Sequence, residues 1–382
     1  SQTFVAQEIL GLQELGCEVR VASLSQGAAA PAPAQARMAD QTSGPRRLAA
    51  LLSQGLAAPR ATWRQVTSEP NWPPPGGTAR IRGGLRIAPF IKDARWADHI
   101  HSHFATEAAD IGRLLAAATG TPFSFTAHGA DAYSDPAELA VNLRATCFAR
   151  AASPHVGKML RLAAPDLSVA DRVIEIPVAV DTEQFASPSP YRADGDVISI
   201  GRLVEKKGFS TLISAFASVQ DSEPLSGRSL IVIGDGPLRA TLEAQATQEG
   251  ARVSFLGALP HDQLMKRTWP AALFALTPQI APDGDRDGRP TVLIEALAGG
   301  LPVLSTSIPG IDDLITPAIG VLAESGSVTS VGQELVSILA LPPEIRENMG
   351  RQGVAVARPY GRTSVAKSIL DAFRRGSSYN SR

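Results

Sequence analysis

The second half of the chain alternates short apolar strands with amphipathic helices, and this pattern constrains the fold more than any other feature of the sequence. The segments expected to form strands are residues 197–201, 230–234, 252–257, 273–277 and 302–306. Apolar strands joined by such helices predict a parallel sheet that is covered on both faces. Ligands bind such sheets at the carboxyl ends of the strands, so the polar, glycine-rich loops at those ends form the candidate site.

The first half of the chain follows a similar α/β pattern. Strands are expected at 18–24, 98–104, 123–129 and 172–178, and helices at 106–118 and 136–151. The chain opens on a helical pattern, with Val5, Ile9 and Leu12 at helical spacing. Because a βα unit places a strand before its helix, we expect the first strand of this domain to be missing from the chain.

Length and local composition predict the domain organisation. A chain of 382 residues is expected to form about two domains, and the Pro/Ser-rich segment 186–195 is the best linker candidate. We predict an N-terminal domain at 1–185 and a C-terminal domain at 196–358. The final segment, 359–382, is expected to form a helix that packs back on the N-terminal domain.

Charge and cysteine content narrow the class of protein. The formal net charge of −1 gives no signature of nucleic-acid binding. Two cysteines provide neither a disulfide framework nor a metal-ligand spacing, which favours a reducing, cytoplasmic location. No apolar run is long enough to span a bilayer, and no signal peptide is recognisable.

Two carboxylates, Asp287 and Glu295, flank the start of a short apolar helix that follows the strand at 273–277. The residues that lead into this helix are Gly288, Arg289, Pro290 and Thr291. Glu295 lies on the less apolar face, where a carboxylate can accept hydrogen bonds from a ribose diol. The alternative is a surface glutamate on an amphipathic helix.

A calcium-binding loop is a second interpretation of this acidic segment. Asp283, Asp285 and Asp287 with Gly288 match the start of an EF-hand loop. The match then fails, because the twelfth position is Ile294 rather than glutamate. Calcium binding is therefore disfavoured.

Two further strand ends carry residues suited to phosphate. In the segment GRLVEKKG, Arg202 and Lys207 flank a helix N-terminus, where they could hold a diphosphate together with the helix dipole. A solvated basic loop is the alternative. Gly234 begins a second glycine-rich turn, GDGPLR, which lacks the third glycine of a dinucleotide fingerprint.

The histidines fall into two groups. His99, His101 and His103 alternate along one predicted strand and therefore share a face. A metal site is conceivable there, but a structural or pocket-lining role is favoured because no carboxylate or cysteine lies at ligand spacing nearby. His128 follows a strand end in TAHGAD, where it can contact a sugar hydroxyl or a phosphate oxygen.

Taken together, these segments resemble the retaining glycosyltransferases of family 4, and in particular those of exopolysaccharide and colanic acid biosynthesis. The resemblance covers nearly the whole chain and rests on SQTFVAQEI, HSHF, FSFTAHGAD, IPVAVDTEQF, GRLVEKKG, LIVIGDGPLR, VSFLGAL and DGRPTVLIEALAGGLPVLST. It implies the GT-B fold, in which two Rossmann-like domains with parallel sheets face each other across a cleft. It also implies that no metal or other cofactor is needed.

The resemblance assigns roles to individual residues. Arg202 and Lys207 match the pair that holds the donor diphosphate, and Glu295 matches the acid that binds the ribose. Asp287 matches the first acid of the same motif, near the transferred sugar, and His128 matches a histidine near the hexose.

The remaining donor contacts follow from the same resemblance. The backbone of Gly288, Arg289, Pro290 and Thr291 is expected to lie against the sugar and the phosphate, and Gly234 belongs to the donor-binding set. Two departures stand out. Asp287 is one methylene shorter than the family's usual glutamate, and the family's first strand with its glycine-rich loop has no counterpart here.

The implied function is a metal-independent, retaining hexosyltransferase. It would move a hexosyl unit from a UDP- or GDP-linked sugar to a hydroxyl of a polysaccharide or glycolipid. A non-catalytic or truncated nucleotide-sugar-binding protein is the main alternative. A nucleotide-sugar epimerase with the same fold is less favoured, because the block from Asp287 to Glu295 fits transferases better.

A basic stretch at residues 37–95 bears on the acceptor and on localisation. It holds ten Arg or Lys and three Asp or Glu, with leucines and Trp63 interspersed. Such a stretch could bind the anionic inner face of a membrane and reach a lipid-linked sugar. An ordinary amphipathic surface is the favoured alternative.

Overall fold

A computed structural model describes residues 3–23, 35–38, 87, 90–133, 136–185, 191–259, 271–282 and 284–379. The chain divides into two compact units. Unit 1 comprises Ser1–Val178 with Val365–Arg382, and unit 2 comprises Ala179–Ser364. The sequence placed the corresponding boundaries at 185, 196 and 358.

Unit 2 contains a six-stranded parallel sheet with the strand order β12-β11-β10-β7-β8-β9. Its strands are β7 (Val197–Ile200), β8 (Leu230–Ile233), β9 (Val253–Phe255), β10 (Leu273–Ala275), β11 (Val303–Ser307) and β12 (Gly320–Glu324). The order reverses at β7 and β10, which lie side by side in the middle of the sheet. Their carboxyl ends therefore form the topological switch point where ligands of such sheets bind.

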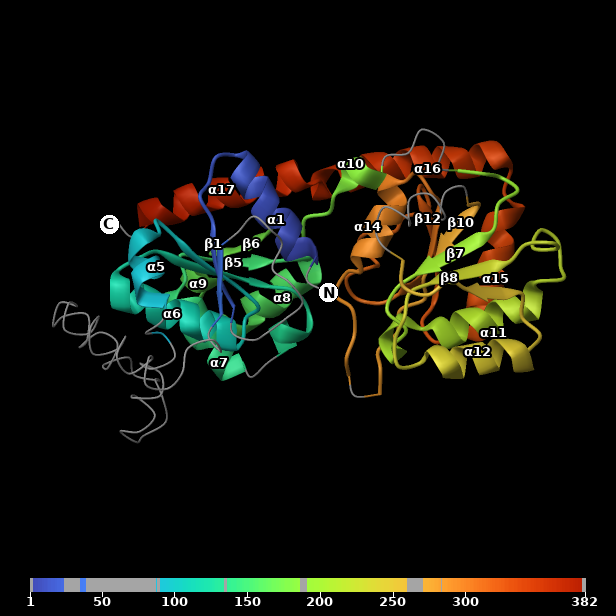
Figure 1. Ribbon diagram of the computed structural model, residues 1–382, viewed down its shortest axis with the longest axis horizontal. Helices are drawn as coiled ribbons and strands as arrows, with labels where there is room; N and C mark the ends of the chain where they lie inside the picture. The colour runs from blue at the N-terminus through green and yellow to red at the C-terminus, as the bar shows by residue number, and fades with distance from the viewer. Residues whose placement is uncertain are drawn as a thin grey trace. The chain divides into compact units, whose positions relative to one another are not determined.

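Helices cover both faces of this sheet (Figure 1). One face carries α11 (Phe209–Val219), α12 (Arg239–Gln248) and α15 (Val328–Ala340), and the other carries α14 (Thr291–Ala298) and α16 (Pro343–Ala357). Shorter helices are η4 (Glu205–Lys207), α10 (Thr182–Phe185) and η5 (Arg358–Tyr360). The parallel α/β architecture predicted for this half of the chain is confirmed.

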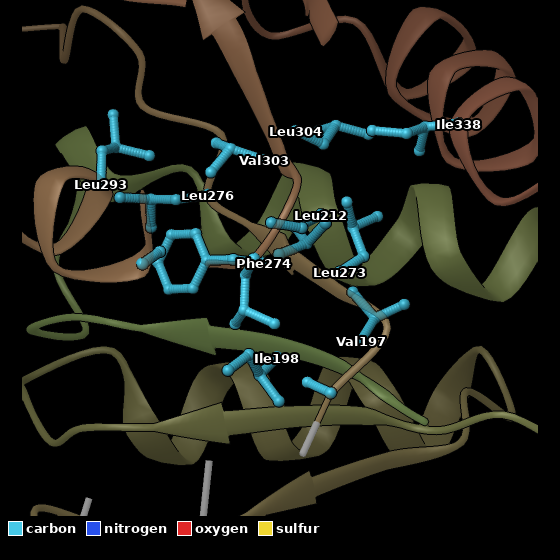
Figure 2. Close-up of a cluster of buried hydrophobic side chains, with 14 of the residues drawn as sticks. Val197, Ile198, Leu212, Leu273, Phe274, Leu276, Leu293, Val303, Leu304 and Ile338 are labelled. Carbon is cyan, nitrogen blue, oxygen red and sulfur yellow. The ribbon is translucent and has the colours of Figure 1, made fainter. Parts of the chain in front are cut away.

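The core of unit 2 explains why the strands are apolar along their whole length. Alternate strand residues face opposite sides of the sheet. One face carries Val197, Leu273 and Leu304 with Leu212 of α11 and Ile338 of α15. The other carries Ile198, Phe274, Leu276 and Val303 with Leu293 of α14 (Figure 2). Each of these side chains is at most 1% exposed, so each contributes roughly 1.5–3 kcal/mol of burial free energy.

Unit 1 contains a four-stranded parallel sheet in the order β3-β4-β5-β6 and a separate parallel pair, β1-β2. The strands are β1 (Arg20–Ser23), β2 (Gln35–Met38), β3 (Ile100–His103), β4 (Phe123–Ala127), β5 (Phe148–Ala151) and β6 (Val173–Glu175). The helices are α1 (Thr3–Glu14), α5 (Ile91–Trp96), α6 (Glu107–Thr119), α7 (Pro136–Ala145), α8 (Pro154–Ala163) and α9 (Leu167–Ala170), with η3 at Ala130–Tyr133.

The last helix, α17 (Arg362–Tyr379), belongs to unit 1 from Val365 onward. Its Phe373 ring lies 4.3 Å from the His99 ring and 5.9 Å from the Phe148 ring, measured between centroids. Helix α17 thus places an aromatic ring against the start of β3 and against β5.

One secondary-structure prediction is wrong. The segment 136–151 was expected to be a single helix, but the helix ends at Ala145 and Phe148–Ala151 forms β5. Alanine and leucine favour a helix here, yet β5 pairs with both β4 and β6 and is buried along its length. Tertiary pairing overrides the local helix propensity.

Three features of the sequence lie at least partly outside the described residues. They are most of the basic stretch at 37–95, and the first part of the linker candidate, residues 186–190, together with Asp283 of the acidic segment. None of the described helices combines the length and the apolar character that crossing a bilayer requires.

Gly208 offers a test of how tightly the loops at the switch point are packed. It has a φ of +68°, and a Cβ built on it would lie 1.8 Å from the backbone oxygen of Thr277. Gly208→Ala should therefore lower the free energy of unfolding by at least about 2 kcal/mol in urea denaturation, because strain and a backbone clash add.

Gly250→Ala is the matched control, because Gly250 has a φ of +62° with no atom within 4 Å of the added Cβ. It should cost only the conformational strain of about 1 kcal/mol. Equal losses in the two variants would contradict the packing argument.

Candidate functional site

The candidate site lies at the carboxyl ends of β7 and β10, and hydrogen bonds join the loops that leave these strands. The Thr277 hydroxyl donates to the Gly208 carbonyl at 2.8 Å, and the Gln279 amide donates to the Lys206 carbonyl at 3.0 Å. These contacts hold η4 and the start of α11 beside the loop that leads to α14. Arg202, Lys207 and Asp287 all belong to these two loops.

Ion pairs also join the two loops. Lys207 Nζ lies 2.6 Å from Asp287 Oδ2, and both side chains are about 15% exposed. Lys206 Nζ lies 3.0 Å from Asp285 Oδ1 and 3.7 Å from Asp287 Oδ1. The Lys207 contact is a charge pair rather than a well-aligned hydrogen bond, since Asp287 Oδ2 has no hydrogen-bond partner. The shorter aspartate therefore reaches the lysine that the sequence assigned to the diphosphate.

Glu295 lies one turn into α14, four residues after Thr291. Burial raises the pKa of Glu295 to about 7, although the Thr291 hydroxyl and the Lys207 charge act in the opposite direction. Lys207 thus influences both acids that the sequence singled out. A carboxyl group with a pKa near 7 and a lysine nearby, at the carboxyl ends of central strands, mark a candidate functional site.

Arg202 and Gly234 lie at neighbouring strand ends. The Arg202 side chain is exposed and makes no ion pair or side-chain hydrogen bond with any described residue. Gly234 follows β8, and a Cβ there would lie 1.8 Å from the Gly201 carbonyl oxygen. The two turns approach each other closely, beside the exposed Arg202.

The Arg289 side chain is held within unit 2. Its guanidinium donates to the Gly310 carbonyl at 2.9 Å and to the Tyr360 hydroxyl at 2.5 Å, and it pairs with Asp313. These contacts fix the backbone of 288–291 at the start of α14. Because Arg289 is already satisfied, its backbone rather than its side chain is the part suited to a ligand.

His128 belongs to unit 1, where it follows β4. The Asp131 carboxylate accepts hydrogen bonds from the amides of His128 and Gly129 at 2.9 and 2.8 Å and so fixes the turn. The His128 ring packs against Phe4 and Phe104, with centroid distances of 4.6 and 4.9 Å. Its Nδ1 atom is buried and has no hydrogen-bond partner in the part of the chain that the structure describes.

The strand histidines make contacts with hydroxyl groups of β4. The Ser124 hydroxyl lies 2.7 Å from both His99 Nε2 and His101 Nδ1, and the Thr126 hydroxyl lies 2.8 Å from His101 Nε2. Burial lowers the pKa of His99 to about 4 and that of His101 well below its usual value. Both rings are therefore neutral at pH 7.

A group compatible with a metal ion does occur in unit 1. Ligand atoms of Glu8, His101 and His103 lie within 4.8 Å of one another. The Arg150 guanidinium, however, contacts Glu8 at 2.5 Å, and both ring nitrogens of His101 have hydroxyl partners. A fixed positive charge and occupied nitrogens favour a hydrogen-bonded network over a metal centre.

Lys206 and Glu8 are among the residues of these networks that had no role in the sequence interpretation. Lys206 pairs with the acidic loop, and only its place beside Lys207 would have suggested it. Glu8 is 2% exposed and falls on the helical stripe defined by Val5 and Leu12. A charged residue on an apolar stripe is the signal that could have identified it.

Two family models match this chain. Glycosyltransferase Family 4 matches residues 1–184, and Glycosyl transferases group 1 matches residues 180–355. The crystal structure of Anabaena HepE in complex with UDP has a TM-score of 0.62 to this chain at 19% identity, over 75% of this chain and 81% of that one. The structural likeness shows a GT-B fold.

Curated relatives agree with this placement. A GDP-mannose-dependent monoacylated α-(1-6)-phosphatidylinositol monomannoside mannosyltransferase of Corynebacterium glutamicum is 29% identical over 47% of this chain and 50% of its own length. A protein of Bacillus subtilis named for teichuronic acid biosynthesis, TuaC, is 28% identical over 69% of this chain and 66% of its own length. The chain thus spans about half to two thirds of the length of these relatives. With both family models matched in order, it belongs to the glycosyltransferases that join a family 4 domain to a group 1 domain.

Proposed function

We propose that the protein is a retaining hexosyltransferase whose unit 2 binds a UDP- or GDP-linked sugar. The observation that carries the proposal is the position of Lys207, which pairs with Asp287 and acts electrostatically on Glu295. All three residues lie where the strand order of unit 2 reverses. A cation and two acids at that place suit a ligand that has both phosphate and hydroxyl groups.

In this proposal each side chain recognises one part of the donor. Arg202 and Lys207 bind the diphosphate through charge-assisted hydrogen bonds, with the start of α11 beside them. Glu295 accepts hydrogen bonds from the ribose diol. When the donor binds, Lys207 shifts part of its contact from Asp287 to the diphosphate. Asp287 then lies beside the transferred sugar.

The proposed reaction breaks the bond between the sugar C1 and the diphosphate oxygen and forms a bond from C1 to the acceptor oxygen on the same face. The acceptor hydroxyl gives its proton to the leaving diphosphate. Arg202 and Lys207 stabilise the negative charge that develops on that group. Because these side chains supply the charge, the proposal requires no metal ion.

The relatives support a carbohydrate or lipid-linked acceptor. One is named as a mannosyltransferase of a phosphatidylinositol monomannoside and another for teichuronic acid biosynthesis. We propose the same acceptor class here. A non-catalytic nucleotide-sugar-binding protein is the second candidate, favoured by the presence of Asp287 where the family has glutamate.

Removal of the basic pair tests the donor site. Arg202→Ala/Lys207→Ala should weaken the binding of UDP and GDP by about 100-fold or more, because two charge-assisted hydrogen bonds are lost. Isothermal titration calorimetry measures the change. Arg351→Ala/Arg358→Ala is the control, since it removes the same charge from exposed residues beyond the site.

Normal binding in the Arg202→Ala/Lys207→Ala variant would place the donor site elsewhere. Glu295→Ala gives a second test, because loss of the ribose contact should weaken nucleotide binding strongly.

Product analysis then separates the two candidate functions. Transfer with retention at the anomeric carbon in the presence of a chelator supports the enzyme, whereas binding without transfer supports the non-catalytic protein.

The raised pKa of Glu295 predicts a pH dependence of donor binding. If the carboxylate form binds the ribose, a proton must leave Glu295 below pH 7 before the donor binds. The affinity for UDP- or GDP-sugars should therefore be roughly tenfold weaker at pH 6 than at pH 8. Calorimetry at the two pH values measures the difference, and Glu295→Gln should abolish it. An equal pH dependence in this variant would refute the assignment.

Peripheral membrane contact through residues 37–95 remains part of the proposal, because this stretch has a charge balance of +7. The protein should sediment with anionic liposomes at low salt and be released at high salt, since each basic residue near the surface contributes about 1 kcal/mol. Neutral liposomes are the control. A protein that stays in the supernatant with anionic liposomes at low salt has no such contact.

A further inference from the structure

A continuous series of polar contacts in unit 1 ends at His128. The Arg150 guanidinium of β5 lies 2.5 Å from Glu8 of α1. The other oxygen of Glu8 lies 3.3 Å from His103 Nε2, and His103 Nδ1 lies 3.0 Å from His128 Nε2. Three elements and the turn after β4 therefore meet in one chain of contacts, which we call the Glu8 relay.

The Arg150 end of the Glu8 relay is fixed. Arg150 is 0% exposed, and its guanidinium also donates to the carbonyls of Ile176 at 2.9 Å and Pro177 at 2.5 Å. Although burial alone raises the pKa of Glu8, Arg150 and His103 bring it well below its usual value. Glu8 is thus a carboxylate, which can only accept hydrogen bonds.

The charge on Glu8 sets the direction of every hydrogen bond that follows. Because Glu8 accepts, Nε2 of a neutral His103 carries the proton and its Nδ1 carries a lone pair. That lone pair accepts from His128, so the proton of a neutral His128 lies on Nε2. The remaining atom, His128 Nδ1, is then a hydrogen-bond acceptor, and it is buried without a partner.

We propose that Glu8 and His103 are positioning residues that hold His128 as the Nε2–H tautomer, with Nδ1 directed as an acceptor to a sugar hydroxyl. A lone pair attracts a hydroxyl proton and repels a phosphate oxygen. His128 therefore recognises a neutral hydroxyl group and not the diphosphate. This inference rests on the proposed function, which supplies the sugar.

The surroundings of His128 are consistent with a neutral ring. Burial is the main factor that lowers the pKa of His128, and the nearby His103 and Arg150 lower it further, against the opposite effect of Glu8. Asp131 contacts the backbone amide of His128. The rings of Phe4 and Phe104 pack against it and carry no charge. The inference concerns neutral imidazole rings, so the test belongs at pH 8.

The tautomer can be read directly from ¹⁵N–¹H spectra of ¹⁵N-histidine-labelled protein, with His128→Asn to assign the signal. The wild type should show His128 as a single Nε2–H tautomer. Glu8→Gln should shift it toward the Nδ1–H form, because a glutamine amide can donate to His103 and reverse the relay. Transfer to the acceptor should fall about tenfold in kcat/KM, the effect of one hydrogen bond.

Two substitutions at His103 separate positioning from packing. His103→Asn keeps an acceptor oxygen near the Nδ1 position and should retain the His128 tautomer and most of the activity. His103→Leu fills similar space without an acceptor and should give mixed tautomers with a loss of about tenfold. Thr126→Val is the matched control, because it removes a hydroxyl partner of His101 in the same sheet and leaves the Glu8 relay complete.

Nucleotide binding distinguishes failure of this inference from failure of the proposed function. UDP and GDP affinities should be unchanged in all of these variants, because their binding residues belong to unit 2. An Nδ1–H His128 in the wild type, or a tautomer that Glu8→Gln leaves unaltered, would overturn the relay. A zinc titration that shifts His101 and His103 together would replace it with a metal site.

Discussion

The contact between Lys207 and Asp287 connects the two loops on which the candidate site depends. It joins η4, which follows β7, to the segment that leads into α14, and it lies beside Glu295. Lys206 strengthens the same connection through Asp285. Because the partners are largely withdrawn from solvent, the pair is screened less than a surface salt bridge. The pair thus holds the two loops in place. A ligand with its own negative charge can compete for Lys207 within this loop geometry, which is already formed.

A buried charge organises unit 1 in a comparable way. Arg150 has no access to solvent, and its partners are Glu8 and two backbone carbonyls. Such an ion costs much free energy to bury unless its hydrogen bonds are satisfied. The arrangement links the first helix to the strands and imposes a direction on the hydrogen bonds that reach His128. In unit 2 the Lys207–Asp287 pair lies beside Glu295, and in unit 1 the Arg150–Glu8 pair orients the hydrogen bonds that reach His128.

Several elements could be predicted from local pattern, and others could not. The βα alternation of unit 2 was predictable because parallel strands must be apolar on both faces. The strand at Phe148–Ala151 was not, because its alanines favour a helix and only pairing with β4 and β6 makes it a strand. Strand β12 and helices α15 and α16 were not assigned individually. Their sequences continue the same α/β pattern without a motif that marks them.

The sequence by itself determined the family and the α/β architecture and predicted residues for a nucleotide sugar, since these follow from periodicity and from motifs a few residues long. Only the tertiary structure decided how those residues are engaged. It directs the Arg289 side chain into its own unit, leaves Arg202 without a side-chain partner among the described residues, and raises the pKa of Glu295 through burial. It also brings Glu8 and Arg150, which are 142 positions apart, into contact. Contacts and burial of this kind depend on packing between distant segments, which no local pattern encodes.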